Sequence, residues 1–264
     1  MLMAGQKMTI DFSKYIKAGR ELFSSLFFPL RCPVCDEILE PEETKKGIHS
    51  ACESKLYLIR GAVCMHCGRP LGDSYPEDYV KEYCYDCLRK KYDKQSYVKQ
   101  AKSLFVYKGA VKQSMYRFKY ANKREYAAFF ADQALAEHGA WLQYMGLDAI
   151  VPVSLYPKKK RKRGYNQAEV FARELSARTG VPVETDLVQR VIDTVPQKGL
   201  GDLQRKNNLK NAFFCGQTVV QYKCVLIVDD IYTTGSTAEA VARELIKKGT
   251  HRVCLLTVCI GGDV

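Results

Sequence analysis

The feature that most constrains the fold of this chain is a series of four ligand pairs, in each of which two residues separate the two ligands. The pairs are Cys32–Cys35, His49–Cys52, Cys64–Cys67 and Cys84–Cys87. This spacing lets one tight turn direct both side chains at a single metal ion, and two such turns complete a tetrahedral site. The ligands therefore predict two Zn²⁺ ions in closed structural sites, with no coordination position left for water or substrate.

The sequence leaves the pairing of these turns open. Sequential pairing joins the first pair to the second and the third to the fourth, and interleaved pairing is the alternative. His66 is an alternative nitrogen ligand, but it lies inside the turn between Cys64 and Cys67, so we favour His49. Unligated structural thiols would require the repeated spacing to be a coincidence. Because a segment of about 55 residues buries little apolar surface, we expect metal binding to supply much of its folding free energy.

Composition indicates a globular chain. Its 264 residues, 47% of them hydrophobic, allow one domain of ordinary size and a small accessory module. No apolar run approaches the roughly 20 residues that span a bilayer, and no secretory signal is recognised, so we predict a cytoplasmic protein with no membrane span. The formal charge of +12 favours partners that carry phosphate, either nucleic acid or a pyrophosphate. The cysteines outside the pairs are expected to be buried small hydrophobic residues: Cys215, Cys224, Cys254 and Cys259.

The order of hydrophobic patterns predicts an α/β fold. We divide the chain into an amino-terminal helical segment (1–30), a double zinc ribbon (31–92) and a second domain (101–264), with a polar connector at 88–100. In the second domain we expect strands at 103–107, 149–153, 181–185 and 224–228, helices at 110–120, 123–142, 168–178 and 238–248, and a final strand. Lys158–Arg163 is expected to be a basic loop, and Gly180 to end a helix. This alternation predicts a parallel sheet flanked by helices, with ligands at the carboxyl ends of its strands.

The sharpest chemical signal lies in the segment Val225–Thr237. An apolar strand ends in Asp229 and Asp230, and a turn rich in hydroxyl groups then leads into a predicted helix. Backbone amides and hydroxyl groups at a helix amino terminus suit a phosphate. The two carboxylates suit a ribose diol, bound directly or through a hydrated divalent metal. The segment therefore predicts a ribose 5-phosphate site, and an ordinary capped turn is the alternative. The sequence has neither a G-x-x-x-x-G-K-[ST] motif nor a G-x-G-x-x-G motif after a strand, so an ATPase or Rossmann site has no support.

The stretch Val228–Thr237 resembles the motif with which type I phosphoribosyltransferases bind 5-phosphoribosyl-1-pyrophosphate (PRPP). The wider chain is similar to the ComF family. That similarity is carried by Phe28-Pro29, the double zinc ribbon, Val151-Pro152-Val153, Arg163–Gln167 and Gln197–Leu209. The resemblance implies a phosphoribosyltransferase-like α/β domain preceded by the ribbon. It also implies a link to the handling of imported single-stranded DNA during natural transformation.

The resemblance also assigns roles to individual residues. Thr233, Thr234, Gly235, Ser236 and Thr237 are expected to hold the 5-phosphate, and Asp229 and Asp230 to lie by the ribose hydroxyls of PRPP bound with Mg²⁺. Lys158–Arg163 is expected to face the pyrophosphate, with Arg163 as the first choice. Gln197–Asn208 is expected to form a mobile flap, with Arg205 and Lys206 as closing cations. Purine-salvage members of the superfamily carry a carboxylate at the position of Thr233, so this chain shows no built-in general base there.

Three functions are compatible with these patterns. The first, which we rank highest, is a PRPP-binding protein that handles imported single-stranded DNA. The second is an active Mg²⁺-dependent phosphoribosyltransferase with an unknown acceptor. The third is a scaffold in which the ribbon recruits a DNA translocase, such as a competence helicase, while the sugar-phosphate site regulates. The acceptor, the oligomeric state and the partner of the ribbon are not specified by the sequence.

Overall fold

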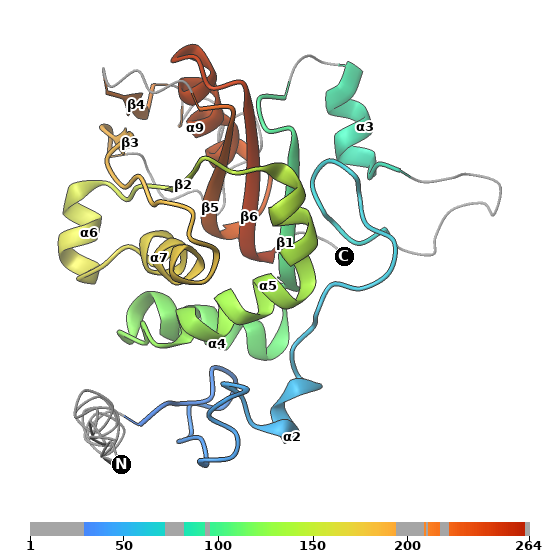
Figure 1. The fold of residues 1–264 in the computed structure, drawn as a ribbon, viewed down its shortest axis with the longest axis vertical. Coiled ribbons are helices and arrows are strands. Elements are labelled where there is room, and N and C mark those ends of the chain that lie inside the picture. The colour runs from blue at the N-terminus through green and yellow to red at the C-terminus, as the bar shows by residue number, and fades with distance from the viewer. Residues whose placement is uncertain are drawn as a thin grey trace, which may run out of the picture.

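The core of the molecule is a four-stranded parallel sheet (Figure 1). The computed structural model describes residues 29–71, 82–92, 96–193, 209, 211–216 and 222–261. In the order in which they lie side by side, the strands are β1 (Gln100–Val106), β6 (Arg252–Ile260), β5 (Cys224–Tyr232) and β2 (Ala149–Pro152). All neighbouring pairs are parallel. The predicted parallel α/β sheet is therefore confirmed.

The two faces of the sheet belong to two separate hydrophobic cores. Leu226 and Val228 of β5 pack into one core, whereas Val225 and Ile227 pack into the other. Successive side chains of a strand point to opposite faces, so a continuous apolar run such as that of β5 fits a strand that is buried on both sides.

Helices cover both faces of this sheet. On one face lie α4 (Gly109–Tyr120), α5 (Tyr126–Met145) and α7 (Gln167–Thr179), and on the other lies α9 (Ser236–Lys247). The Asn166 side chain accepts a hydrogen bond from the Ala168 amide and so caps the start of α7. Gly180 ends α7, as predicted. The flanking helices agree with the predicted fold class, and no helix in the described ranges is long and apolar enough to cross a membrane.

Two local predictions in the second domain were wrong. The segment expected to be a basic loop contains the helix α6 (Pro157–Arg163), because Pro157 favours a first helical turn and Gly164, with φ at 83°, ends the helix. The strand expected at 181–185 is reduced to a single bridge between Val183 and Ile150. A separate antiparallel pair, which the sequence did not predict, is formed by β3 (Val188–Arg190) and β4 (Phe213–Cys215).

The ribbon lies along the free edge of β1. Tyr57 accepts a hydrogen bond from the Val106 amide, Leu104 accepts one from Ile59, and further along the strand His66 accepts one from Ala101. These contacts cover a sheet edge that would otherwise expose unpaired backbone groups. The ribbon contributes two short helices, α2 (Ser50–Glu53) and α3 (Tyr85–Tyr92), and α3 continues into the segment that we expected to be a polar connector.

Some predictions fall outside the described residues. These are most of the amino-terminal helical segment, since description starts at residue 29, and the flap Gln197–Asn208 with Arg205 and Lys206. The four cysteines expected in the core are buried: Cys215, Cys224, Cys254 and Cys259.

Candidate functional site: an acid pair and turn beside a metal-binding ribbon

The first metal cluster joins Cys32, Cys35, His49 and Cys52, whose ligand atoms all lie within 4.8 Å of one another. The Sγ atom of Cys35 lies 3.2 Å from Nδ1 of His49. The other ring nitrogen of His49, Nε2, lies 3.1 Å from the Ile38 carbonyl oxygen, to which it donates. That hydrogen bond fixes the tautomer of His49 and leaves Nδ1 available to a metal.

The second cluster joins Cys64, Cys67, Cys84 and Cys87 within the same 4.8 Å limit. The Sγ atoms of Cys67 and Cys84 lie 3.6 Å apart. His66 stands beside this cluster rather than in it. Its Nδ1 is 3.5 Å from the Cys87 Sγ and its Nε2 is 2.9 Å from the Ser96 hydroxyl.

The two clusters fit structural zinc. One offers three thiolates and an imidazole and the other offers four thiolates, and both sets match the tetrahedral preference of Zn²⁺. Each set is complete with protein ligands, so neither leaves a position at which a substrate binds the metal. The turns associate sequentially along the chain, and the interleaved alternative does not occur.

The predicted acid pair lies at the carboxyl end of β5. The Asp230 amide donates to Oδ1 of Asp229 over 2.8 Å. Oδ2 of Asp230 forms an ion pair of 3.0 Å with Nζ of Lys119, which reaches it from the last turn of α4. Burial, reinforced by the charge of Asp230, raises the pKa of Asp229 to about 7. Burial by itself would lower the pKa of Lys119, but the Asp230 carboxylate outweighs it and the pKa is raised.

The turn after the acid pair is tight and leads directly into a helix. Gly235 adopts a φ of 78°, and a Cβ atom at this position would lie 2.7 Å from the Tyr232 hydroxyl, so only glycine fits. The hydroxyl oxygens of Thr234 and Ser236 lie 2.8 Å apart, and α9 begins at Ser236. The turn closes over a cavity of about 20 Å³, which has room for about one water molecule. Backbone amides at the start of a helix of this length attract an anion.

Three further side chains, which sequence reasoning missed, surround the acid pair. The first is Lys119, described above. The second is Tyr107, whose hydroxyl lies close enough to feel the charges of Lys119 and Asp230. Burial raises the pKa of the Tyr107 hydroxyl. Burial lowers the pKa of Arg190 on β3, although the charge of Asp229 opposes this shift. Each of these residues is far from Asp229 in the sequence and belongs to no motif, so only the fold brings them together.

Arg163, which we predicted to face pyrophosphate, lies at the end of α6. Its guanidinium group donates to Oε1 of Gln167 over 2.7 Å and lies over the Tyr120 ring, with 5.0 Å between the guanidinium carbon and the ring centroid. Tyr120 follows Lys119 directly in the chain, so Arg163 belongs to the same region as the acid pair. Its contact with a pyrophosphate stays a prediction.

The second metal cluster is connected to the turn and to α9 by residues of the ribbon and of the segment that follows it. Nη2 of Arg69 donates to the Thr233 carbonyl oxygen over 3.4 Å. The Tyr97 amide donates to Oε2 of Glu239, in the first turn of α9, over 2.8 Å, and the Ser96 hydroxyl donates to the other oxygen of the same carboxylate. Thr233 in the turn and Glu239 in the helix that follows it are therefore held by residues that lie near the second cluster.

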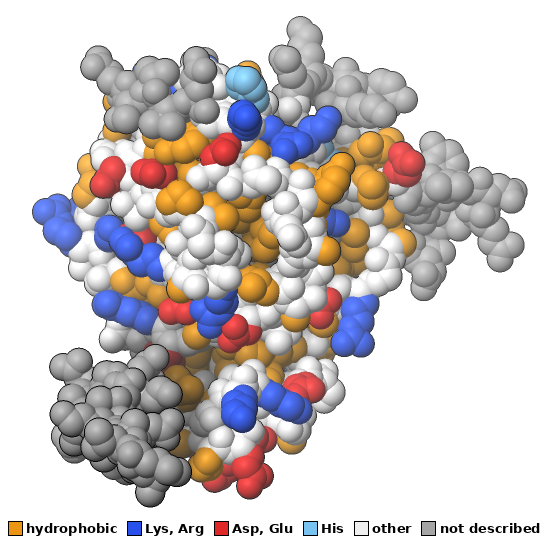
Figure 2. Space-filling view, in the orientation of Figure 1, with side chains coloured by type: hydrophobic (Ala, Val, Ile, Leu, Met, Phe, Trp, Pro, Cys, Tyr) orange, Lys and Arg blue, Asp and Glu red, His pale blue; other side chains and the backbone are white. Residues whose placement is uncertain are grey.

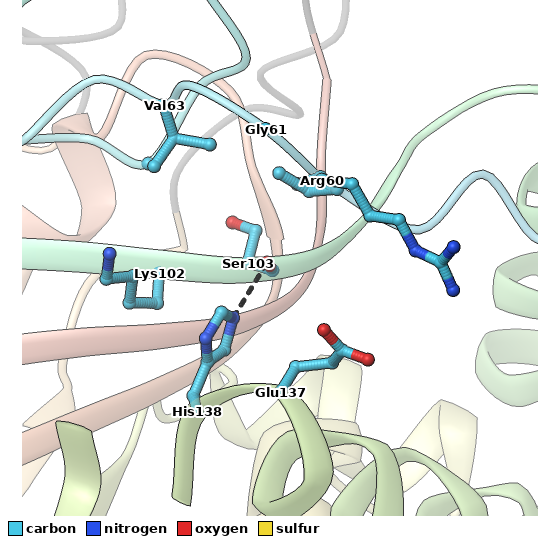
Figure 3. A pocket seen from close by; sticks show the side chains of 9 residues that line it. Arg60, Gly61, Val63, Lys102, Ser103, Glu137 and His138 are labelled. Carbon is cyan, nitrogen blue, oxygen red and sulfur yellow. Dashed lines mark hydrogen bonds between the residues drawn. The ribbon is translucent and has the colours of Figure 1, made fainter. Parts of the chain in front are cut away.

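A larger cavity, of about 560 Å³, lies between the ribbon and the sheet and contains none of the predicted site residues (Figure 3). In Figure 3 Glu137 and His138 of α5 lie on one side of Lys102 and Ser103, and Arg60 of the ribbon lies on the other. Nε2 of His138 donates to the Ser103 carbonyl oxygen over 3.1 Å. Burial lowers the pKa of His138, so this imidazole is neutral and holds α5 against β1.

Comparisons with known proteins agree with this arrangement. The Double zinc ribbon domain family matches residues 23–88. Competence protein F of Haemophilus influenzae is 30% identical over 243 residues, which cover 86% of this chain and 95% of that protein. DNA utilization protein YhgH of Escherichia coli K12 is 30% identical over 216 residues, covering 81% of this chain and 90% of that protein. Competence protein ComFC of Bacillus subtilis is 26% identical over 227 residues, covering 80% and 82%.

Proposed function

Because this chain belongs to the ComF family, we propose that it binds PRPP at the turn Asp229–Thr237 and takes part in handling imported single-stranded DNA during natural transformation. The observation that carries the proposal is the acid pair at the end of a buried strand, followed by a glycine with positive φ and a helix amino terminus. A phosphate and a vicinal diol are the two groups that such a turn recognises together.

In the proposed complex, the 5-phosphate accepts hydrogen bonds from the amides and hydroxyl groups of Thr233–Thr237. Asp229 and Asp230 accept from the ribose hydroxyls, and Mg²⁺ bound with PRPP offsets the charge of the pyrophosphate. Arg163 and the neighbouring cations of α6 supply the positive field for that pyrophosphate. Because Lys119 already neutralises Asp230, the site attracts a highly charged anion in spite of its two carboxylates.

The remaining parts of the chain have supporting roles in this proposal. The amino-terminal helical segment (1–30), the ribbon (31–92) and the sugar-phosphate domain (101–264) form the proposed division. The two Zn²⁺ ions stabilise the ribbon and the edge of the sheet beside it. The proposed location is the cytoplasm, where imported single strands meet a competence helicase, and the net charge of +12 favours contact with DNA.

Calorimetric titration of PRPP with Mg²⁺ tests the ligand. We expect the wild type to bind and the variant Asp229→Asn/Asp230→Asn to lose binding, because its turn no longer offers carboxylates to the ribose or the metal. Asp132→Asn is the matched control, since Asp132 is an exposed acid that pairs with Arg178 away from the turn. A wild type that carries zinc, is folded and shows no heat with PRPP would refute the proposal.

Phosphoribosyl transfer is the second candidate function, and the cations beside the acid pair favour it. Arg163 and the other cations of α6 supply positive charge for a pyrophosphate leaving group. Release of pyrophosphate is the measurement, with nucleobases and single-stranded DNA offered in turn as acceptors. If PRPP binds and no acceptor releases pyrophosphate above the rate of hydrolysis, binding without transfer is the function.

A further inference from the structure

The outer face of α4 carries two tyrosines that the core does not use. Tyr116 and Tyr120 are one helical turn apart and are 64% and 61% exposed. Their ring centroids lie 5.2 Å apart with the planes inclined by 51°. Met115 and Phe118 of the same helix are fully buried in the core. The tyrosine pair is not part of that core and presents an aromatic surface to solvent.

Cations border this aromatic pair on both sides. Lys112 lies one turn before Tyr116 on the same face, and the Arg163 guanidinium lies over the Tyr120 ring with its hydroxyl 3.5 Å away. Arg163 is the last residue of α6, in which every residue after Pro157 is a cation. Figure 2 shows blue side chains on the flank of the molecule where Figure 1 places α6. We call Lys112, Tyr116, Tyr120 and Arg163 the tyrosine strip.

The tyrosine strip lies next to the proposed sugar-phosphate turn. Lys119, which precedes Tyr120, is the ion-pair partner of Asp230. Nζ of Lys112 lies 5.8 Å from the centroid of the Tyr107 ring. The Tyr107 ring and the Thr233 methyl group both lie beside Gly261. A Cβ atom on Gly261 would be 3.8 Å from the Tyr107 ring and 3.7 Å from the Thr233 methyl group. A ligand that covers the tyrosine strip therefore ends beside the turn.

We propose that the tyrosine strip binds single-stranded nucleic acid, with unpaired bases stacked on Tyr116 and Tyr120 and phosphates held by Lys112 and α6. Paired aromatic faces between cations are the surface that single strands use, because every base has a flat face and every linkage a negative charge. Duplex DNA hides its base faces inside the helix, so it meets only the cations. The inference rests on the proposed function in one respect, which is that the bound strand lies beside the PRPP turn.

Fluorescence anisotropy with a labelled oligothymidylate tests this surface. We expect Tyr116→Ala/Tyr120→Ala to weaken binding by roughly tenfold for each base that no longer stacks. Tyr116→Phe/Tyr120→Phe keeps both rings and should bind like the wild type. Tyr144→Ala is the matched control, because Tyr144 is 82% exposed but lies near Arg252 at the amino end of β6. PRPP binding should be unchanged in Tyr144→Ala and in the single variant Tyr116→Ala, which leaves the contact between Arg163 and Tyr120 intact.

Salt dependence separates the two kinds of contact. Loss of the tyrosines should lower affinity without changing the slope of log K against log salt, whereas Lys112→Ala should reduce the slope by about one. Unchanged affinity in the double alanine variant overturns the inference and leaves PRPP binding untouched. A wild type that binds PRPP but no oligothymidylate also overturns it, together with the DNA part of the proposed function. Equal losses for duplex and single strand would overturn it too, because stacking requires unpaired bases.

Discussion

At the scale of single residues, Asp229 and Asp230 are adjacent acids, and Lys119 forms an ion pair with Asp230. The pKa of Asp229 is raised from 3.8 to about 7, so its protonated form is favoured in the folded state. The stability that this acid contributes is therefore present below about pH 4 and is lost as the pH rises through about 7. At higher pH both acids are charged, and the folded state depends on Lys119.

Replacing Lys119 by Met should consequently destabilise the protein more at about pH 8 than at about pH 5. Its side chain is only 19% exposed and that of Asp230 only 16%, so we expect a loss of about 2–3 kcal/mol at the higher pH. At the lower pH the loss should be smaller, because Asp229 is protonated. Thermal unfolding at both values is the measurement. Lys247→Met is the control, since Lys247 forms an exposed pair with Glu244 that should be worth less than about 1 kcal/mol. Equal losses at both pH values would show that the charge of Asp229 has no part in the effect.

At the scale of helices and strands, the sequence predicted the elements whose signals are local. The apolar run Val225–Val228 predicted β5, and Gly180 predicted the end of α7. Both signals are visible because apolar runs and helix caps act over a few residues. The sequence did not predict α6, because a run of cations has no apolar periodicity. The helical signals of α6 are confined to Pro157 at its start and Gly164 after its end. The pair β3 and β4 joins residues far apart in the chain, and three-residue strands leave no periodicity to read.

The same distinction applies to the candidate site. The metal ligands and the turn after β5 are contiguous motifs, so their residue types were visible in the sequence. Lys119 and Tyr107 flank the acid pair only because α4 follows β1 at the carboxyl end of the sheet. Arg190 reaches the same place from β3. A pairing that depends on topology carries no signal in local composition.

The contact between α5 and β1 depends on a neutral histidine. Burial lowers the pKa of His138 from 6.5; nearby Lys102 lowers it further, while the Ser103 carbonyl and Glu137 oppose the shift. A lowered pKa means that the stability from this contact is present above about 6.5 and is lost as the pH falls. His138→Gln keeps an N–H donor for Ser103 and removes the titration.

We therefore expect wild-type stability to fall between about pH 7 and pH 5 by about 1 kcal/mol more than that of His138→Gln. Denaturant unfolding across this range is the measurement. His251→Gln is the control, because His251 is exposed at the other end of the sheet. If His138→Gln and His251→Gln both lose stability with falling pH as the wild type does, protonation of His138 does not weaken the contact between α5 and β1.

At the scale of the whole molecule, the two metal clusters support different faces of one sheet. Cys32 and Cys52 pack in the core that contains α4, α5 and α7, whereas Cys64 and Cys67 pack in the core that contains α9. Within the described residues, the neighbours of the second cluster contact the proposed PRPP turn, through Arg69 and Thr233. Loss of either metal should weaken the fold, but the consequences for the ligand should differ.

Substitution of one ligand in each cluster tests this asymmetry. Cys35→Ser and Cys87→Ser should each release about one zinc ion and lower the unfolding temperature, because a structural site needs all four ligands. Only Cys87→Ser should also weaken PRPP binding, by roughly fivefold or more, since it releases the segment that holds Thr233 and Glu239. Arg69→Gln addresses the same link with both metals in place. Arg31→Gln is its control, because Arg31 lies beside the first cluster and donates to the Asp36 carbonyl oxygen. Zinc content, unfolding temperature and PRPP affinity are measured on the same samples, below the unfolding transition of the weakest variant. If the two cysteine variants lose PRPP affinity equally and Arg69→Gln loses none, the ribbon stabilises the fold as a whole and the turn does not depend on the second metal in particular.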